Sequence, residues 1–303
     1  MTRIIFMGTP DYAASILEAL ITATDIEVVS VYTQPDKPVG RKALLTPPIV
    51  KVIAEKGNIP VIQPPRLRDE AVVDGILETS CDMIIVAAYG QILPKAILDH
   101  APCVNLHASI LPQYRGASPI QQSLLNNDPQ SGVTAMWMDE GLDTGAIIKI
   151  ETLPIGADEM VESLYARLTD TAVHLTLDII RSWDRKNALK QNDPEATHCK
   201  KILKSDGLID FSDAREMYNR YRAYTPWPGI FTESGLKIKS MLLEEENSNG
   251  EAGIITQIEK ESILIQCKKG SLRIIKVQAP SKQETSVVDY LNGKRIGCGH
   301  PLV

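Results

Sequence analysis

The sequence predicts an α/β fold, in which an open, mostly parallel Rossmann-like sheet with helices on both faces precedes a smaller C-terminal antiparallel β-barrel domain of the OB-like kind. In the first half, apolar runs at 3–7, 28–32, 83–88 and 103–106 alternate with helix-length segments. Near-continuous apolar strands of this kind are typical of a parallel sheet covered on both faces. Beyond residue 207, short strands between Gly, Asn and Ser turns indicate a small barrel.

The first strand ends at Gly8-Thr-Pro10, and a helix follows with apolar residues at three- and four-residue spacing. The segment Gly8-Thr-Pro-Asp lacks the G-x-G-x-x-G spacing, so dinucleotide binding is not favoured. Residues 28–32 form the second strand, and 33–46 are expected to be a loop. An amphipathic pattern over 159–183 predicts one long helix.

The C-terminal strands are expected at 230–232, 236–238, 253–258, 262–266 and 272–277. Between the two patterns, 185–206 is polar, contains Asp193-Pro194 and has no sustained periodicity, which favours a linker. We therefore predict a first domain at 1–185, a linker at 186–206 and a second domain at 207–303.

Composition excludes several classes of protein. A net charge of −6 argues against bulk polyanion binding, so any nucleic-acid contact must come from local basic patches. No apolar run approaches the roughly 18 residues that span a bilayer, and the apolar part of the first residues is too short for a secretory signal. The five cysteines are scattered without metal-ligand spacing. We expect a cytoplasmic protein without metal or membrane contact.

The most informative residues are Asn105, His107 and Asp143, which lie where apolar runs become turns. An amide can donate a hydrogen bond to an oxyanion, an imidazole can move a proton near neutral pH, and a carboxylate can orient that imidazole. Because ligands bind beyond the carboxyl ends of parallel strands, Asn105 and His107 are well placed. Gly141 and Gly145 allow a tight backbone turn around Asp143. Together these residue types suit an acyl transfer to an amine.

At these residues the chain closely resembles the formyltetrahydrofolate-dependent formyltransferases. The motifs that match are Asn105-x-His107, Ser109-Ile-Leu-Pro112 and the Asp143 loop, with Ile110 in place of the usual leucine. Further matching segments at 4–11, 33–38, 86–94 and 222–229 extend the resemblance over essentially the whole chain. It implies that Asn105, His107 and Asp143 are catalytic and that the formyl donor is 10-formyltetrahydrofolate.

The resemblance also implies a folate site in the first domain. Its expected members come from two segments: Tyr89, Gly90, Ile92 and Leu93 in the first, and Ser109, Ile110, Leu111 and Pro112 in the second. Their backbone groups are expected to pair with the edge of the pterin in a mostly apolar pocket. Residues 7–10 are expected to lie nearby and to help receive the side chain of the acceptor.

The loop 38–48 indicates which substrate accepts the formyl group. It resembles an insertion that, in the family members acting on transfer RNA, enters the acceptor stem. We therefore expect the α-amino group of methionyl-initiator transfer RNA to be formylated for translation initiation. Arg41, Lys42, Lys201 and Lys204 are the expected contacts, and the second domain is expected to bind transfer RNA. The loop carries fewer lysines than is usual, which predicts a flatter salt dependence of binding. We expect a monomer.

Two alternatives remain open. One keeps the folate donor and replaces transfer RNA by an amino sugar or a small nucleotide. The other is a non-catalytic nucleotide-binding or RNA-binding module, which leaves the set Asn105, His107 and Asp143 unexplained. A formyl-transfer assay with both acceptors distinguishes the first alternative from the transfer RNA enzyme. Absence of folate binding would favour the second alternative.

Overall fold

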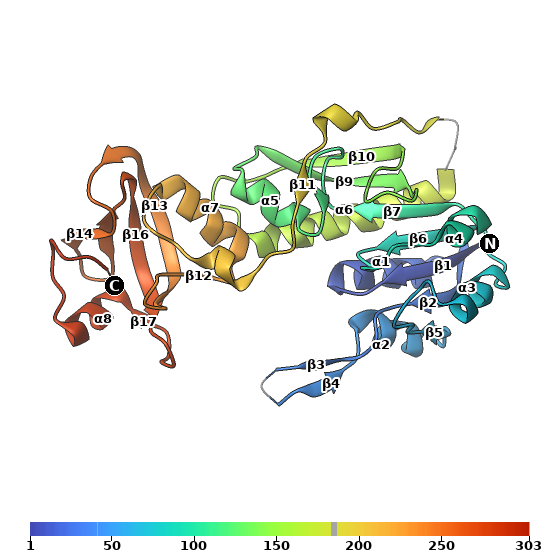
Figure 1. The fold of residues 1–303 in the computed structure, drawn as a ribbon, viewed down its shortest axis with the longest axis horizontal. Helices are drawn as coiled ribbons and strands as arrows, with labels where there is room; N and C mark the ends of the chain where they lie inside the picture. Colours follow the sequence, from blue (N-terminus) through green and yellow to red (C-terminus); the bar gives the residue numbers. More distant parts are fainter. Residues whose placement is uncertain (41, 183–186, 303) are drawn as a thin grey trace. The chain divides into compact units, whose positions relative to one another are not determined.

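The computed structural model describes residues 1–40, 42–182 and 187–302, which form two compact units (Figure 1). Unit 1 contains Met1–Pro119, Gln130–Ile155 and Leu164–Cys199, and unit 2 contains Ile120–Pro129, Gly156–Ser163 and Lys200–Val303. The predicted domain bounds at 1–185, 186–206 and 207–303 differ from these units. Residues 187–199 of the predicted linker pack within unit 1. The sequence did not indicate this, because backbone pairing in a polar segment leaves no periodic pattern of apolar residues.

Unit 1 is built on a seven-stranded sheet in the order β10-β9-β7-β6-β1-β2-β5. The strands are β1(Thr2–Gly8), β2(Ile26–Tyr32), β5(Val61–Ile62), β6(Met83–Ala87), β7(Cys103–His107), β9(Gln130–Trp137) and β10(Ile147–Pro154). β5, β2, β1, β6 and β7 pair in parallel, while β9 is antiparallel to both β7 and β10. The predicted mostly parallel sheet is confirmed.

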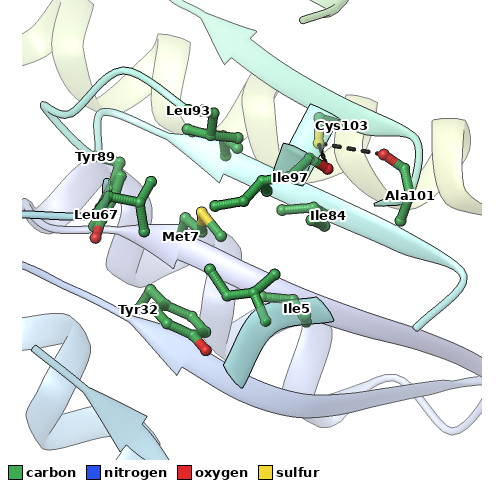
Figure 2. Close-up of a cluster of buried hydrophobic side chains, with 12 residues drawn as sticks. Ile5, Met7, Tyr32, Leu67, Ile84, Tyr89, Leu93, Ile97, Ala101 and Cys103 are labelled. Atoms are coloured by element: carbon green, nitrogen blue, oxygen red, sulfur yellow. Dashed lines mark hydrogen bonds between the residues drawn. The ribbon is translucent and has the colours of Figure 1, made fainter. Parts of the chain in front are cut away.

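Helices cover both faces of this sheet. The helices of unit 1 are α1(Asp11–Thr22), α2(Ile49–Lys56), α3(Glu70–Leu77), α4(Lys95–His100) and most of α6(Val161–Ser182). Side chains alternate between the faces of a strand, and Figure 2 shows Ile5, Met7 and Ile84 packed with Ile97 of α4. On the opposite face, a Cβ added at Gly8 would lie 2.5 Å from the Cβ of Ala13 in α1.

The strand order has a topological switch point at the carboxyl ends of β1 and β6. β2 lies on one side of β1 and β6 on the other, so the chain connections diverge from the gap between β1 and β6. Ligands bind at such switch points in open α/β sheets. The segments that leave this edge are 9–10 after β1, 88–94 after β6 and 108–114 after β7.

The predicted loop 33–46 contains a hairpin of β3(Lys37–Val39) and β4(Leu44–Thr46). All six strand residues are exposed, including Leu44 and Leu45 at 65% and 68%. A hairpin that buries neither face shows no apolar alternation, and Pro38 argues against a strand. The sequence pattern therefore missed it.

Unit 2 contains an antiparallel sheet in the order β12-β13-β16-β15-β14, with β17 beside β16. Its strands are β12(Ile230–Phe231), β13(Lys237–Asn249), β14(Ile254–Ile258), β15(Ile263–Gln266), β16(Lys269–Gln278) and β17(Thr285–Ser286). The predicted antiparallel C-terminal domain is confirmed. β13 is much longer than the expected 236–238. The prediction was too short because the second half of the strand is mostly exposed and carries glutamates, which are uncommon in strands.

Helix α7(Ala214–Tyr224) ties two inserted segments into unit 2. Its first turn is capped by Asp213, whose Oδ1 accepts from the Glu216 amide at 3.1 Å. Arg222, 1% exposed, donates to Asn127 Oδ1 at 2.8 Å and to the Gly156 carbonyl at 3.4 Å. Burial lowers the pKa of Arg222. The remaining helices are α5(Pro119–Leu125) and α8(Val287–Lys294).

None of the helices within residues 1–40, 42–182 and 187–302 is long and apolar enough to cross a membrane. In the same residues, no group of three or more His, Cys, Asp and Glu could hold a metal ion. The expected absence of a metal stays a prediction.

The cysteines differ in burial, which predicts the order in which they react. Cys103, Cys199 and Cys267 are buried, whereas Cys298 is exposed. Burial raises the pKa of the Cys199 thiol and raises the pKa of Cys267 to about 12. Because the thiolate is the nucleophile, iodoacetamide at pH 8 should modify Cys298 first, measured by peptide mass spectrometry. Unfolded protein should lose this order, and equal rates at Cys267 and Cys298 in the native protein would contradict the burial.

Candidate active site

The structure brings Asn105, His107 and Asp143 together at the carboxyl end of β7. Asn105 Nδ2 donates to Asp143 Oδ1 at 3.4 Å, and His107 Nδ1 lies 3.6 Å from Asp143 Oδ2. The His107 and Asp143 side chains are only 7% and 11% exposed. Asn105 and His107 point to the same side because they are two residues apart on one strand.

The second nitrogen of His107 is held by the backbone. His107 Nε2 lies 2.9 Å from the Tyr114 carbonyl oxygen. A carbonyl oxygen only accepts, so Nε2 carries a hydrogen in this arrangement. Nδ1, which faces Asp143, is then the nitrogen that can gain or lose a proton.

Asp143 is oriented by a backbone donor that the sequence did not reveal. The Gly116 N–H, in β8(Arg115–Gly116), donates to Asp143 Oδ2 at 2.8 Å. Asp143 itself has φ 55°, in the left-handed region that few residues other than glycine adopt. A Cβ added at Gly145 would lie 1.7 Å from the Trp137 carbonyl oxygen. Only glycine fits there, as the glycines around Asp143 suggested.

The segments expected to bind folate lie at the same edge of the sheet. The Tyr89 carbonyl accepts from Thr9 Oγ1 at 3.4 Å and from Gln34 Nε2 at 3.1 Å, which ties together the segments that follow β1, β6 and β2. Gly90 has φ 79°. Asp99 beside Lys95 and, to a smaller extent, the charge of Glu140 raise the pKa of that lysine.

The side chains in the first of these segments divide into two groups. Tyr89 and Leu93, each 2% exposed, belong to the core cluster in Figure 2. Burial raises the pKa of Tyr89. Ile92, by contrast, is 74% exposed. Of this segment, Gly90 and Ile92 are therefore the residues exposed to a ligand.

In the second segment, the turn after His107 is held from β9. Thr134 Oγ1 donates to the Ser109 carbonyl at 2.7 Å and accepts from the Leu111 amide at 3.1 Å. Ser109 Oγ donates to the Gln113 carbonyl at 2.6 Å. Ser109 and Leu111 are buried, whereas Ile110 and Pro112 are partly exposed. These hydrogen bonds fix the backbone conformation of residues 109–112.

The basic residues expected to bind transfer RNA are distributed over both units. Arg41 lies outside the described residues. Lys42 is exposed in the turn between β3 and β4 of unit 1. Lys201 and Lys204 are exposed in unit 2, Lys204 at the start of η3(Lys204–Gly207).

Sequence reasoning missed Gln191, which is 5% exposed and contacts the Asp143 loop. Its Nε2 donates to the Asp143 and Gly145 carbonyls at 2.9 and 2.8 Å. In the sequence it stands between Lys190 and Asn192 in a polar stretch, so no pattern separated it from its neighbours.

Two family models match successive parts of the chain. One, described as formyl transferase, matches residues 2–180, and one described as formyl transferase, C-terminal domain, matches residues 201–295. The chain belongs to the formyl transferase family. The resemblance drawn from the sequence is confirmed, and so is the prediction of an enzyme that transfers formyl groups.

Close relatives carry a more particular name. A methionyl-tRNA formyltransferase of Sulfurimonas denitrificans is 56% identical over 300 residues, covering 99% of both chains. A protein of the same name from Nitratiruptor sp. is 50% identical over 299 residues, covering 98% of both.

Solved structures share the fold. A sugar 3N-formyl transferase, solved with dTDP and 5-N-formyl-THF, is 21% identical with a TM-score of 0.68, covering 93% of this chain and 99% of that one. HypX from Aquifex aeolicus, in complex with tetrahydrofolic acid, is 16% identical with a TM-score of 0.61, covering 98% of this chain and 48% of that one. At these identities the likeness concerns the fold alone.

Thr134 provides a test of how the turn 109–112 is held. Replacing Thr134 by Val keeps the shape but leaves the Ser109 carbonyl and the Leu111 amide without their partner. A buried group left unpaired costs about 1–3 kcal/mol, so we expect Thr134→Val to lower the urea midpoint of unfolding. Thr134→Ser retains the hydroxyl and serves as the control. Equal midpoints for the Val and Ser variants would show that these hydrogen bonds contribute little.

Proposed function

We propose that this chain transfers the formyl group of 10-formyltetrahydrofolate to the α-amino group of methionine on initiator methionyl-tRNA. The observation that carries the proposal is the convergence of Asn105, His107 and Asp143 at one sheet edge in a formyl transferase. Its full-length relatives named methionyl-tRNA formyltransferase support the choice of acceptor. The product is N-formylmethionyl-tRNA, used to initiate translation.

The accessible groups fit a flat heterocycle with a polar edge. Ile92 and Leu142 are exposed by 74% and 60% in the segments after β6 and β9, where apolar side chains could cover a ring. The backbone of the two expected folate segments is held by hydrogen bonds from Gln34 to the Tyr89 carbonyl and from the Leu111 amide to Thr134. The folate donor supplies the activated formyl group, and these two segments with the Asp143 loop hold it.

Asn105 and His107 carry the chemistry in this proposal. The Asn105 amide donates a hydrogen bond to the negative charge that develops on the formyl oxygen, and loss of such a donor typically costs about 3–4 kcal/mol of barrier. The attacking α-amine has an ordinary pKa of about 8, so a useful fraction is neutral before it reacts. His107 Nδ1 receives its proton during transfer and returns it to the departing nitrogen.

Asp143 acts through His107. Its carboxylate lies 3.6 Å from the nitrogen that changes protonation and offsets the charge of the imidazolium. The Gly116 amide holds the carboxylate in place at 2.8 Å. Asp143 therefore positions His107 and stabilises its charged form.

The hairpin of β3 and β4 is the element we assign to transfer RNA. It is exposed on all six strand residues, and Lys42 stands in its turn. Unit 2 adds Lys201 and Lys204 as candidate phosphate contacts. A lysine that neutralises a phosphate releases counterions, which makes binding depend on salt.

The test of the proposed function is transfer of labelled formyl from 10-formyltetrahydrofolate. We expect label on charged initiator transfer RNA and much less on charged elongator transfer RNA or on an amino sugar nucleotide. His107→Ala should lower kcat about 100- to 10,000-fold and leave the transfer RNA dissociation constant within about twofold.

His174→Ala is the matched control, because His174 is exposed on α6. It should retain the kcat of the wild type. Label on the amino sugar nucleotide alone would overturn the choice of acceptor, and equal losses of turnover and affinity in His107→Ala would overturn its catalytic role.

Lys42 gives a separate test of the hairpin. Lys42→Ala should weaken transfer RNA binding and reduce the slope of log affinity against log salt by about 0.7–0.9, measured by filter binding over a salt series. Lys56→Ala, which removes an exposed lysine at the end of α2, should leave the slope unchanged. The assignment fails if the two variants give the same slope.

A further inference from the structure

We propose that Gln191 is a positioning residue that holds Asp143 against His107 during formyl transfer; this inference rests on the proposed function. Gln191 lies between α6 and the short helix η2(Asp193–Glu195), two residues before η2 begins. It touches neither Asn105 nor His107 in any hydrogen bond of the described residues. It acts through the backbone of the Asp143 loop.

The Gln191 amide is fully used. Its Nε2 donates to the Asp143 carbonyl at 2.9 Å and to the Gly145 carbonyl at 2.8 Å. Its Oε1 accepts from Arg115 Nε at 3.1 Å and from Arg115 Nη2 at 2.8 Å. A primary amide offers two donor hydrogens and two acceptor positions. The reversed orientation would set oxygen against two carbonyls, so only one orientation is possible.

Arg115 joins this amide to the groups that hold the catalytic side chains. Its neighbour Tyr114 accepts from His107 Nε2 at 2.9 Å, and its neighbour Gly116 donates to Asp143 Oδ2 at 2.8 Å. Residues 114–116 therefore hold all three groups. Tyr114 binds His107, Gly116 binds the Asp143 carboxylate, and Arg115 holds the Asp143 backbone through Gln191. The distance between His107 and Asp143 depends on this connection.

The Asp143 loop needs such support. Asp143 has φ 55°, a conformation that persists in residues other than glycine only where the surroundings impose it. Leu142 next to it is 60% exposed, so little side-chain packing holds the loop at that point. The two carbonyls bound by Gln191 lie on either side of Thr144, directly after Asp143.

Gln191 is itself anchored on both sides in the sequence. Leu189 and Ile147 exchange two backbone hydrogen bonds of 2.8 Å. Beyond it, β11(His198–Cys199) pairs in parallel with β8. Gln191 and Arg115 are 5% and 4% exposed. The side chain is therefore fixed to unit 1 independently of the loop that it holds.

The diagnostic variant is Gln191→Glu. A carboxylate keeps an acceptor for Arg115, which supports folding, but it has no hydrogen to donate to the Asp143 and Gly145 carbonyls. Steady-state kinetics should give a kcat at least about tenfold lower, with KM for both substrates changed less than about threefold, as expected for an interaction that matters in the transition state. Rates are normalised to the folded fraction measured by circular dichroism.

Asn192→Asp is the matched control, because it makes the same amide-to-acid change at the next, exposed residue. It should leave kcat within about twofold of the wild type. Gln191→Met is a second variant that removes both donors without adding charge, and it should also lower kcat.

A double-mutant cycle separates positioning from general support of the fold. If Gln191 acts through Asp143, adding Gln191→Glu to Asp143→Asn should lower kcat little further, because coupled residues are not additive. Full additivity, or a Gln191→Glu enzyme with wild-type kcat, would overturn the inference. A wild-type enzyme that fails to formylate methionyl-tRNA would instead overturn the proposed function.

Hydrogen exchange gives a readout that does not depend on the acceptor. Gln191→Glu should speed exchange of the backbone amides in 139–145, measured by mass spectrometry, because the loop opens more often. Asn192→Asp should leave that exchange unchanged. Unchanged exchange in Gln191→Glu would contradict the role of Gln191 whatever the substrate.

Discussion

The carboxylate of Asp143 is the group on which the rest of the site depends. It is almost buried and meets three partners, the Asn105 amide, the His107 ring and the Gly116 N–H. A charge taken from water needs such partners, since its desolvation is otherwise uncompensated. Two of these partners stand on β7 and the third on β8, so Asp143 joins β7 and β8 to the loop after β9.

The fold supplies this meeting point for a general reason. β7 pairs in parallel with β6, so the two strands end at the same edge of the sheet. At that edge the chain connections diverge between β1 and β6. Polar side chains that leave such an edge converge on one crevice. The hydrogen bonds around Asn105, His107 and Asp143 explain how the geometry of this set is maintained.

The residues of the candidate site could be predicted from residue types and order. An amide and an imidazole two residues apart, with an aspartate between glycines downstream, suited acyl transfer, and the structure brings the three side chains together. The supports of those residues could not be predicted. Gln191 stands in a polar stretch that reads as a linker, and the Tyr114 carbonyl and Gly116 amide are backbone groups that every residue possesses.

The sequence by itself determined the parallel sheet, the antiparallel C-terminal unit and the family, because apolar periodicity and short motifs are local properties of the chain. Only the tertiary structure decided that 187–199 belong to unit 1, that 120–129 and 156–163 belong to unit 2, and that 37–39 pair with 44–46. These features rest on hydrogen bonds between residues distant in the chain or on strands with no buried face. Neither leaves a periodic pattern from which a pairing partner can be read.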